Sequence, residues 1–413
     1  MTIKLARLAL LSTLAAAAWA QVNVGEQKNE ASLPFTMTTV ASFKLPWRLA
    51  FLPDGRMLIT EKSGPVWLVS QKGEKILVDN TPAAYFRGQS GMHGVFLSPR
   101  YAADQSIYLT YSEPGEYGGG LALARAKLNA TATSAKLENL EVLWRQMPKG
   151  KGGQEGAQVA FSPDGKYLFL AVGDRQRMTP AQDPDQPEGK ILRLTLDGKP
   201  APGNPEFGKA GASTIPLIDP PRDTELAKTA KVVSTYTFPG TNQTRAETWA
   251  SGVRTPYGLA FSATGELWEV EHGPQGGDEL NLIRPGLNYG WPVIGFGVNY
   301  RTGAAIHSGT VRDGMEPPVH VWVPSIGVSG MMIYTGDKFP AWKGSVFAGG
   351  LAGEQLVRLT LDGRRAEMAD ILLRRQGRVR DVRQGPDGFI YVAIDNRQGT
   401  PTPIVRLKPV TRR

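Results

Sequence analysis

Three features of the sequence predict an all-β fold, and among all-β folds a six-bladed β-propeller. An apolar strand, a turn of the Pro-Asp-Gly type and further strands rich in aromatic and β-branched residues recur six times. The 413 residues include 48 Gly and 31 Pro without a collagen-like period, which indicates many turns between short strands. Little of the chain has helical periodicity. Because each copy can bury only one face by itself, the copies are expected to stack around a ring.

The six copies follow one another along the whole chain. Their first strands and turns lie at 49–59, 94–99, 159–169, 258–268, 330–334 and 382–392. A strand at 36–43 is expected to complete the last copy and close the ring. The excess length falls mainly between the third and fourth copies, at 197–248, where long loops would build a site. Two packed β-sandwiches are the structural alternative, but six similar copies favour the ring.

The first twenty residues have the pattern of a signal peptide. Lys4 and Arg7 precede a mostly apolar stretch at 8–19, and Ala-Trp-Ala at 18–20 has the small residues that precede cleavage. The apolar stretch is shorter than the roughly 20 residues that span a bilayer. We therefore expect residues 1–20 to be removed, leaving a periplasmic or secreted propeller at 21–413 without a membrane span.

Charge and cysteine content narrow the classes of partner. The formal net charge is +9, but the Lys and Arg residues are scattered, and no basic run is interleaved with stacking aromatics. Nucleic acid is therefore not an expected partner. Most of the charge is expected to solvate the surface, and a smaller part to attract an anionic ligand or cofactor. The chain has no Cys, which excludes disulfides and thiolate-bound metals.

The stretch at 271–279, Glu-His-Gly-Pro-Gln-Gly-Gly-Asp-Glu, has the chemistry of a hard-cation site. Asp278 and Glu279 are adjacent carboxylates, the Gly-Pro corner leaves backbone carbonyls free, and Tyr289 follows Glu279 by ten residues. Calcium takes its oxygen ligands from carboxylates and carbonyls of this kind. The alternative is an ordinary acidic surface turn, because Gly-Gly-Asp is common turn chemistry.

Several motifs together resemble a known family. They are Arg-Thr-Pro-Tyr-Gly-Leu-Ala-Phe at 254–261, the stretch at 271–279, and Asn-Tyr-Gly-Trp-Pro at 288–292. With them, the chain resembles the soluble aldose sugar dehydrogenases that use pyrroloquinoline quinone (PQQ), which are six-bladed propellers with the glucose/sorbosone dehydrogenase signature. The likeness extends over nearly the whole mature chain, from 46–51 to 378–382.

The resemblance implies two calcium sites. In the family, the carbonyls that correspond to Gly273 and Pro274 hold the calcium that also binds the quinone. Glu279 and Tyr289, with Asp278 beside them, resemble the second calcium site. Calcium on a quinone carbonyl would act as a Lewis acid and make the adjacent carbon a better hydride acceptor.

The resemblance also implies a set of cofactor-binding side chains. Arg254, Arg378 and Arg380 fall where the family pairs guanidinium groups with the cofactor, and Gln89 falls at another cofactor-facing position. A planar tricarboxylate suits bidentate Arg groups. The alternative for each Arg is a surface or inter-blade salt bridge.

The chain departs from the family pattern at the catalytic base, where Gln154 stands in place of His. An amide cannot take the proton of a sugar hydroxyl near neutral pH. His93, His272 and Glu155 are candidate substitutes, and a structural role is the alternative for each.

Two further departures concern cofactor contacts. Ala352 stands in place of a cofactor-binding Lys, and Thr255 and Tyr257 in place of an Asn and a Gln. Losing these groups is expected to weaken cofactor affinity, each charged contact contributing roughly 1.5–3 kcal/mol.

The leading hypothesis is a periplasmic quinoprotein oxidoreductase that oxidises an aldose sugar with calcium-bound PQQ, with Gln154 and Arg254 at the catalytic positions. The sugar, the electron acceptor and the choice between monomer and dimer stay open. The alternative is a non-catalytic, calcium-stabilised propeller that binds a sugar or a protein. A calcium-assisted lactone hydrolase is a third option, since fold alone does not decide function. It would need carboxylate and Asn ligands converging on the central channel.

Overall fold

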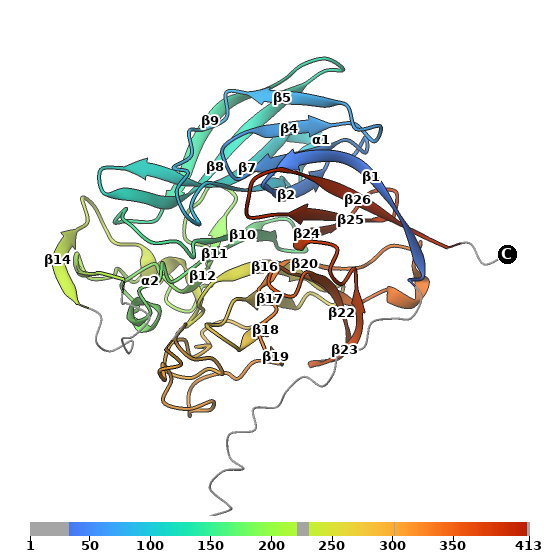
Figure 1. Cartoon of the computed structure of the whole chain (residues 1–413). Helices are drawn as coiled ribbons and strands as arrows, with labels where there is room; N and C mark the ends of the chain where they lie inside the picture. The colour runs from blue at the N-terminus through green and yellow to red at the C-terminus, as the bar shows by residue number, and fades with distance from the viewer. Residues whose placement is uncertain (1–32, 221–230, 301, 411–413) are drawn as a thin grey trace, which may run out of the picture.

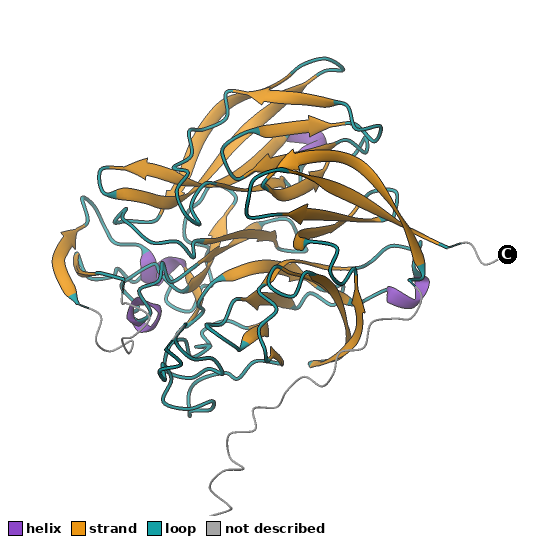
Figure 2. Cartoon of the chain, in the orientation of Figure 1, coloured by secondary structure: helices purple, strands orange, loops and turns teal. Residues whose placement is uncertain are grey.

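The computed structural model describes residues 33–220, 231–300 and 302–410, so the predicted signal peptide at 1–20 lies outside the described residues. The described part is all-β, as the sequence predicts. Its α-helix is limited to single turns, α1 (Tyr101–Asp104) and α2 (Thr244–Glu247), and Figure 2 shows how little of the ribbon is helical. In the same ranges, no helix is long and apolar enough to cross a membrane.

The eight strands that follow β1 (Phe35–Lys44) belong to one sheet. It consists of two antiparallel units, β2–β5 and β6–β9, joined by a short parallel pairing of β5 with β9. The bounds are β2 Pro46–Phe51, β3 Met57–Glu61, β4 Val66–Val69, β5 Lys75–Asp79, β6 Met92–Leu97, β7 Ser106–Gly115, β8 Gly118–Ala130 and β9 Ala135–Arg145.

Four further sheets have four strands each. The third unit contains β10 Gly156–Phe161, β11 Tyr167–Val172, β12 Lys190–Thr195 and β15 Thr248–Ser251. The fourth contains β16 Pro256–Phe261, β17 Leu267–Glu271, β18 Asp278–Ile283 and β19 His320–Trp322. The fifth contains β20 Val328–Ile333, β21 Val346–Gly350, β22 Gln355–Asp362 and β23 Arg365–Leu372. The last contains β24 Arg378–Gln384, β25 Ile390–Asp395, β26 Pro401–Pro409 and β1 Phe35–Lys44.

The first strands of successive units pack against one another. In order around the molecule these strands are β2, β6, β10, β16, β20 and β24, and β24 packs again on β2. The units therefore surround a common centre, with β2–β9 at the top of Figure 1 and β16–β23 below. The site described below lies where loops leave these first strands.

The N-terminal strand closes the last sheet, as expected. β1 pairs antiparallel with β26, so that Phe35 lies opposite Pro409 and Lys44 opposite Pro401. In Figure 1 the dark blue β1 runs beside the dark red β26. The strand predicted at 36–43 is thus confirmed, one residue longer at each end.

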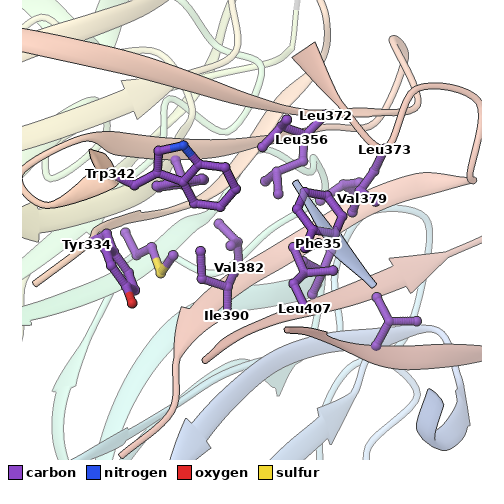
Figure 3. Close-up of a cluster of buried hydrophobic side chains, with 14 of the residues drawn as sticks. Phe35, Tyr334, Trp342, Leu356, Leu372, Leu373, Val379, Val382, Ile390 and Leu407 are labelled. Atoms are coloured by element: carbon purple, nitrogen blue, oxygen red, sulfur yellow. The ribbon is translucent and has the colours of Figure 1, made fainter. Parts of the chain in front are cut away.

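Hydrophobic clusters fill the spaces between neighbouring units. Figure 3 shows one cluster between the fifth and last units, in which Phe35 lies near Trp342 and Leu407. The Phe35 ring meets Trp342 edge-on at 6.1 Å, and Trp342 stacks on Phe339 at 4.4 Å. Burial of each such side chain contributes about 1.5–3 kcal/mol. The cluster therefore fixes β1 to the rest of the ring.

The long connection at 197–248 was expected between the third and fourth units, but it lies within the third unit, because β15 after it pairs with β12. It forms a two-stranded ribbon that the sequence did not predict. It consists of β13 (Thr214–Ile218) and β14 (Val232–Thr237), which stand at the left edge of Figure 1. Arg177 Nε donates to the Ile218 carbonyl at 2.9 Å. This bond ties the ribbon to the loop that follows β11 and so to the edge of the site.

Candidate active site

The loop between β17 and β18 carries the predicted cation motif, and Asp278 holds its shape. Asp278 Oδ1 accepts from the Gly273 N–H at 3.0 Å, and Oδ2 accepts from the Val328 N–H at 2.8 Å. Burial raises the pKa of Asp278 to about 6, although these donors oppose the shift. Gly277 has φ +81°, and a Cβ there would meet Phe296 at 2.9 Å, so the turn requires glycine. Both Asp278 oxygens thus bond to backbone of the loop and of its neighbour.

Arg254, just before β16, lies against this loop. Its Nη1 donates to the carbonyls of His272 and Gly273, each at 2.9 Å, and its guanidinium lies 5.0 Å from the centre of the Trp291 ring. Its backbone N–H donates to Glu271 Oε2. The Nε atom is buried and has no partner. Arg254 therefore presents an unused donor in the site and competes for the Gly273 carbonyl that was predicted to bind calcium.

Gln154 connects the predicted residues to one another. Its backbone N–H donates to Gln89 Oε1 at 2.8 Å. With the side-chain amide assigned so that both of its ends are satisfied, Nε2 donates to Asp174 Oδ1 at 2.6 Å and Oε1 accepts from Arg254 Nη2 at 2.9 Å. Gln89, Gln154 and Arg254 are thus brought together, and their roles toward a cofactor stay predictions.

Asp174 is the member of this group that the sequence did not single out. It follows β11 and is fully buried, and its Oδ2 accepts from Trp291 Nε1 at 2.8 Å. Burial raises the pKa of Asp174, and Arg254 and the neighbouring donors oppose that shift. A cavity of about 220 Å³ is lined by Asp174, Gln154, Arg254, Pro274, Trp291 and Tyr300, among others. The cavity is large enough for a small polar ligand.

Two of the candidate substitute bases, His93 and Glu155, bond to each other. Glu155 Oε2 lies 3.0 Å from His93 Nε2 and accepts from Ser112 Oγ at 2.6 Å, and Oε1 accepts from Ser90 Oγ at 2.6 Å. Burial alone would raise the pKa of Glu155, but the Arg175 charge and these donors lower it to about 2. A carboxylate held in this way is a poor proton acceptor.

His272 is also a weak base. Burial, followed by the charges of Arg254 and Arg380, lowers the pKa of His272 to about 3. Its Nε2 is buried without a partner, and its ring meets the Tyr257 ring edge-on at 4.8 Å. The imidazole is therefore neutral and packed among the loops.

Arg378 and Arg380 lie on β24, across the ring from Gln154. Arg380 donates to Asp395 Oδ2 from Nε at 3.0 Å and from Nη2 at 2.7 Å, and it lies 4.1 Å over the Trp47 ring. Arg378 Nη1 donates to the Leu351 carbonyl at 3.2 Å, whereas its buried Nε has no hydrogen-bond partner and lies 3.9 Å from Asp395 Oδ2. Both guanidinium groups thus pair with Asp395, closely for Arg380 and at 3.9 Å for Arg378. These ion pairs lie within one unit and are neither surface nor inter-blade salt bridges.

Lys62 joins this basic group and was missed in the sequence. Its Nζ donates to the Gly88 carbonyl and lies 5.4 Å from the centre of the Trp47 ring. Burial, followed by the charge of Arg380, lowers the pKa of Lys62 to about 8. A single Lys in a tight turn carries no sequence signal that would distinguish it from a solvated one.

The predicted metal ligand Glu279 belongs to a set of buried carboxylates. Glu271 lies opposite Glu279, and Glu269 opposite Asn281, in the β17–β18 register. Asn281 Nδ2 lies 3.1 Å from Glu269 and 3.4 Å from each of Glu271 and Glu279. Burial and mutual repulsion raise the pKa of Glu269 and of Glu279 well above the ordinary value. Burial raises that of Glu271 to about 8.

The carboxylates around Asn281 have the oxygen ligands that a hard cation prefers, but they do not by themselves form a complete coordination shell. The polar side-chain atoms of the three Glu residues and Asn281 are all oxygens except the Asn281 amide nitrogen. Two of these oxygens, Glu269 Oε1 and Asn281 Oδ1, are buried without hydrogen-bond partners. Within the described ranges, however, no three His, Asp or Glu side chains are grouped so as to hold a metal ion. The Tyr289 hydroxyl bonds to the Leu282 carbonyl at 2.6 Å and the Arg284 N–H at 2.8 Å rather than to Glu279. A cation here would need backbone carbonyls or water as well.

The residues at the remaining departures from the family pattern make contacts within the protein. Tyr257 packs on Trp47 at 6.1 Å, and burial raises its pKa to about 12. Thr255 is fully buried, and its N–H donates to Glu271 Oε2 at 3.1 Å. Ala352 donates its N–H to the Ile326 carbonyl at 2.8 Å.

Comparison with known proteins identifies the family. The model of the Glucose / Sorbosone dehydrogenase family matches residues 43–215 and 224–406. This chain belongs to that family. Aldose sugar dehydrogenase YliI of Escherichia coli (strain K12) is 37% identical over 364 residues, which cover 86% of this chain and 88% of the relative.

Solved structures of the family have the same fold. The soluble aldose sugar dehydrogenase of Escherichia coli in its apo-form aligns with a TM-score of 0.78 at 33% identity, covering 91% of this chain and 100% of its own. The PQQ-bound aldose sugar dehydrogenase of Streptomyces coelicolor aligns with a TM-score of 0.67 at 28% identity, covering 92% and 99%. Family membership supports a sugar oxidoreductase.

Proposed function

We propose that this chain is a quinoprotein dehydrogenase that oxidises an aldose sugar with calcium-bound PQQ. One observation carries the proposal: Gln89, Gln154 and Arg254 meet at the loop that contains the 271–279 motif, beside a cavity of about 220 Å³. The high identity to an aldose sugar dehydrogenase over most of the chain supports the same activity.

The proposed architecture is a six-bladed propeller at 21–413, preceded by a signal peptide at 1–20. The packing of β2, β6, β10, β16, β20 and β24 around a common centre supports blades over paired sandwiches. The export signal is argued from sequence alone, and it would place the enzyme in the periplasm or outside the cell.

The basic side chains around Trp47 and Trp291 would hold the cofactor. Arg254 and Arg378 each have a buried Nε without a hydrogen-bond partner, which fits an anionic tricarboxylate. Lys62 and Arg380 add positive charge beside Trp47, and Gln89 would contribute a neutral contact. PQQ supplies a hydride acceptor when it is bound. Arg254 would stabilise the negative charge that develops there, and the ring of loops would limit the access of water.

Calcium would be held in two places. The carbonyls of Gly273 and Pro274 are proposed for the cation next to the cofactor, with Arg254 sharing the Gly273 oxygen. Glu279, supported by Asp278 and Tyr289, is proposed for the second cation. Glu269 and Glu271 belong to the same set of carboxylates and would lose their mutual repulsion when a cation binds.

The proposal is tested by reconstitution. Apo-protein is mixed with PQQ and calcium, and reduction of an artificial dye is followed with a panel of aldoses. Calcium-dependent dye reduction is expected, and the natural electron acceptor is left to be found. No dye reduction with any sugar, despite bound PQQ, would reject the enzyme and leave the second candidate, a non-catalytic calcium-stabilised propeller.

The second candidate rests on Gln154. Its amide bonds both Asp174 and Arg254 at the position where the family has its catalytic base, and no imidazole replaces it there. No observation favours the lactone hydrolase, because the set of carboxylates with Asn281 lies within one unit, on β17 and β18.

A further inference from the structure

We propose that Asp174 is the proton acceptor of the reaction and takes the proton of the sugar hydroxyl at the carbon that is oxidised. The proposal rests on the proposed function, because it assigns the base that a dehydrogenase of this kind needs and that Gln154 cannot supply.

Asp174 is placed at the centre of the candidate site. It follows β11 and lines the 220 Å³ cavity together with Gln154 and Arg254. Its Oδ1 accepts from Gln154 Nε2 at 2.6 Å and from the Gln176 N–H at 2.9 Å, and its Oδ2 accepts from Trp291 Nε1 at 2.8 Å. Every partner is a donor, so the carboxylate is oriented by bonds that favour its ionised form, although burial outweighs them and raises its pKa.

The other candidates lack either access or basicity. His93 and Glu155 do not line the cavity, and the Glu155 oxygens are occupied by two Ser hydroxyls and His93. His272 has its pKa lowered to about 3 by burial. Asp174 faces the cavity, and burial shifts its pKa in the opposite direction, upward. Among these groups it is the carboxylate best placed to accept a proton from a ligand in the cavity.

Other charged groups surround Asp174 and would tune it. Arg254 and Arg177 contribute positive charge, and Glu271 and Tyr257 also interact with the carboxylate across the site. Arg254 opposes the rise in the pKa of Asp174 that burial causes. Removing the positive charge of Arg254 would therefore raise the pKa of Asp174 further and make it a stronger base.

The reaction balances with Asp174 in this role. With PQQ bound as the oxidant, the hydride would leave the sugar carbon with the C–H electron pair. The O–H electron pair forms the new C=O bond of the lactone, and the O–H proton moves to Asp174 Oδ1. Solvent or the reduced cofactor then removes that proton. The sugar hydroxyl replaces the Gln154 amide as the donor to Oδ1, so Gln154 acts as a positioning residue that keeps the empty site ordered.

Asp174→Asn is the decisive variant, because it keeps the size of the side chain and removes the base. The expected result is a loss of kcat by roughly 100-fold or more, since general base catalysis contributes about 10²–10⁴-fold. Binding of PQQ, followed by absorbance, should change little. Asp164→Asn makes the same chemical change in an exposed turn after β10 and should leave kcat unchanged.

A second readout does not depend on turnover. Calorimetric binding of an aldose is compared with binding of its 1-deoxy analogue, which lacks the hydroxyl that donates to Asp174. The wild type should prefer the aldose, and Asp174→Asn should lose that preference. Asp174→Glu should keep part of the turnover and shift the midpoint of its pH profile, which provides a test if Asp174→Asn does not fold.

The outcomes separate the two proposals. A loaded wild type whose Asp174→Asn variant keeps its turnover, its pH profile and its preference for the aldose overturns the assignment of Asp174 alone. A wild type that does not load PQQ contradicts the proposed function and, because no base is then needed, overturns the assignment as well. Loss of turnover together with loss of the preference supports both.

Discussion

Two buried groups in this molecule, one around a single carboxylate and one around three, differ in how many hydrogen-bond donors their carboxylate oxygens have. Glu155, between the first strands of the second and third units, has hydroxyl donors on both oxygens and His93 beside it, and its pKa is lowered to about 2. Glu269, Glu271 and Glu279 share one Asn281 amide, and the pKa of Glu271 is raised to about 8. The first group is complete without a ligand. The second lacks positive charge, which is the condition under which a protein binds a cation or protons.

The largest expected effect comes from breaking the complete group. Glu155→Ala leaves His93, Ser90 and Ser112 buried without their acceptor and removes a counter-charge from Arg175. We expect the free energy of unfolding to fall by about 3–5 kcal/mol. Denaturant unfolding measures the change. Glu116→Ala, at an exposed position, is the control and should have little effect. Equal stability of the two variants would show that the group around Glu155 is not a stabilising network.

The stability of the protein at acid pH gives a second test of the group around Glu155. The pKa of Glu155 is lower in the folded protein than the ordinary value of about 4.3, so its stabilising contribution is present above pH 4.3. That contribution should be lost as the pH falls from about 4.3 toward 2. Wild type and Glu155→Ala should therefore converge in stability at low pH. A difference that persists unchanged to pH 2 would contradict this account.

The incomplete group should show the opposite dependence in the metal-free protein. The pKa of Glu271 is raised in the folded state, so its favourable contribution is present below about pH 4.3 and is lost as the pH rises through 8. Thermal unfolding with chelator should show stability falling across this range.

Calcium should remove that fall by binding the ionised carboxylates. At a calcium concentration of 100 times Kd, we expect a gain of about 2.7 kcal/mol. Glu279→Gln should reduce the gain, whereas Glu367→Gln, on an exposed position of β23, should not. A calcium effect of the same size in both variants would place the cation elsewhere.

The smallest expected effect concerns one cofactor contact. Arg378→Ala removes a guanidinium whose Nε is buried without a hydrogen-bond partner and 3.9 Å from Asp395 Oδ2. We expect affinity for PQQ to fall by about 1.5 kcal/mol, or roughly tenfold. Arg364→Ala, in the exposed turn between β22 and β23, is the matched control. Titration followed by absorbance measures both, and equal affinities would remove Arg378 from the binding site.

Most of the fold could be predicted because each repeat has a local sequence pattern of strands and turns. Strand alternation and Pro-Asp-Gly turns such as 53–55 and 163–165 mark the hairpins, and the strand at 36–43 was expected to join the C-terminal strand. The β13–β14 ribbon was not predicted, because its exposed strands carry no alternation that ties them to the core.

The site was predictable only where a motif carried it. The family pattern singled out Gln89, Gln154 and Arg254, which lie together in the structure. Asp174 and Lys62 were missed because their surroundings depend on loops from different units. The carboxylates around Glu279 could have been grouped from the sequence by their alternation on two neighbouring strands. Glu269 and Glu271 alternate on β17, and Glu279 and Asn281 alternate on β18, so all four share one face of a hairpin.

Titration of purified apo-protein with PQQ, with and without calcium, shows whether the protein binds this cofactor in a calcium-dependent way. Absorbance and heat are recorded together, so that binding is seen without any assumption about the substrate. We expect tight binding that requires calcium and weakens in Arg378→Ala. Absence of binding at micromolar PQQ in the presence of calcium would contradict this expectation and would leave a propeller that has lost the enzyme's cofactor.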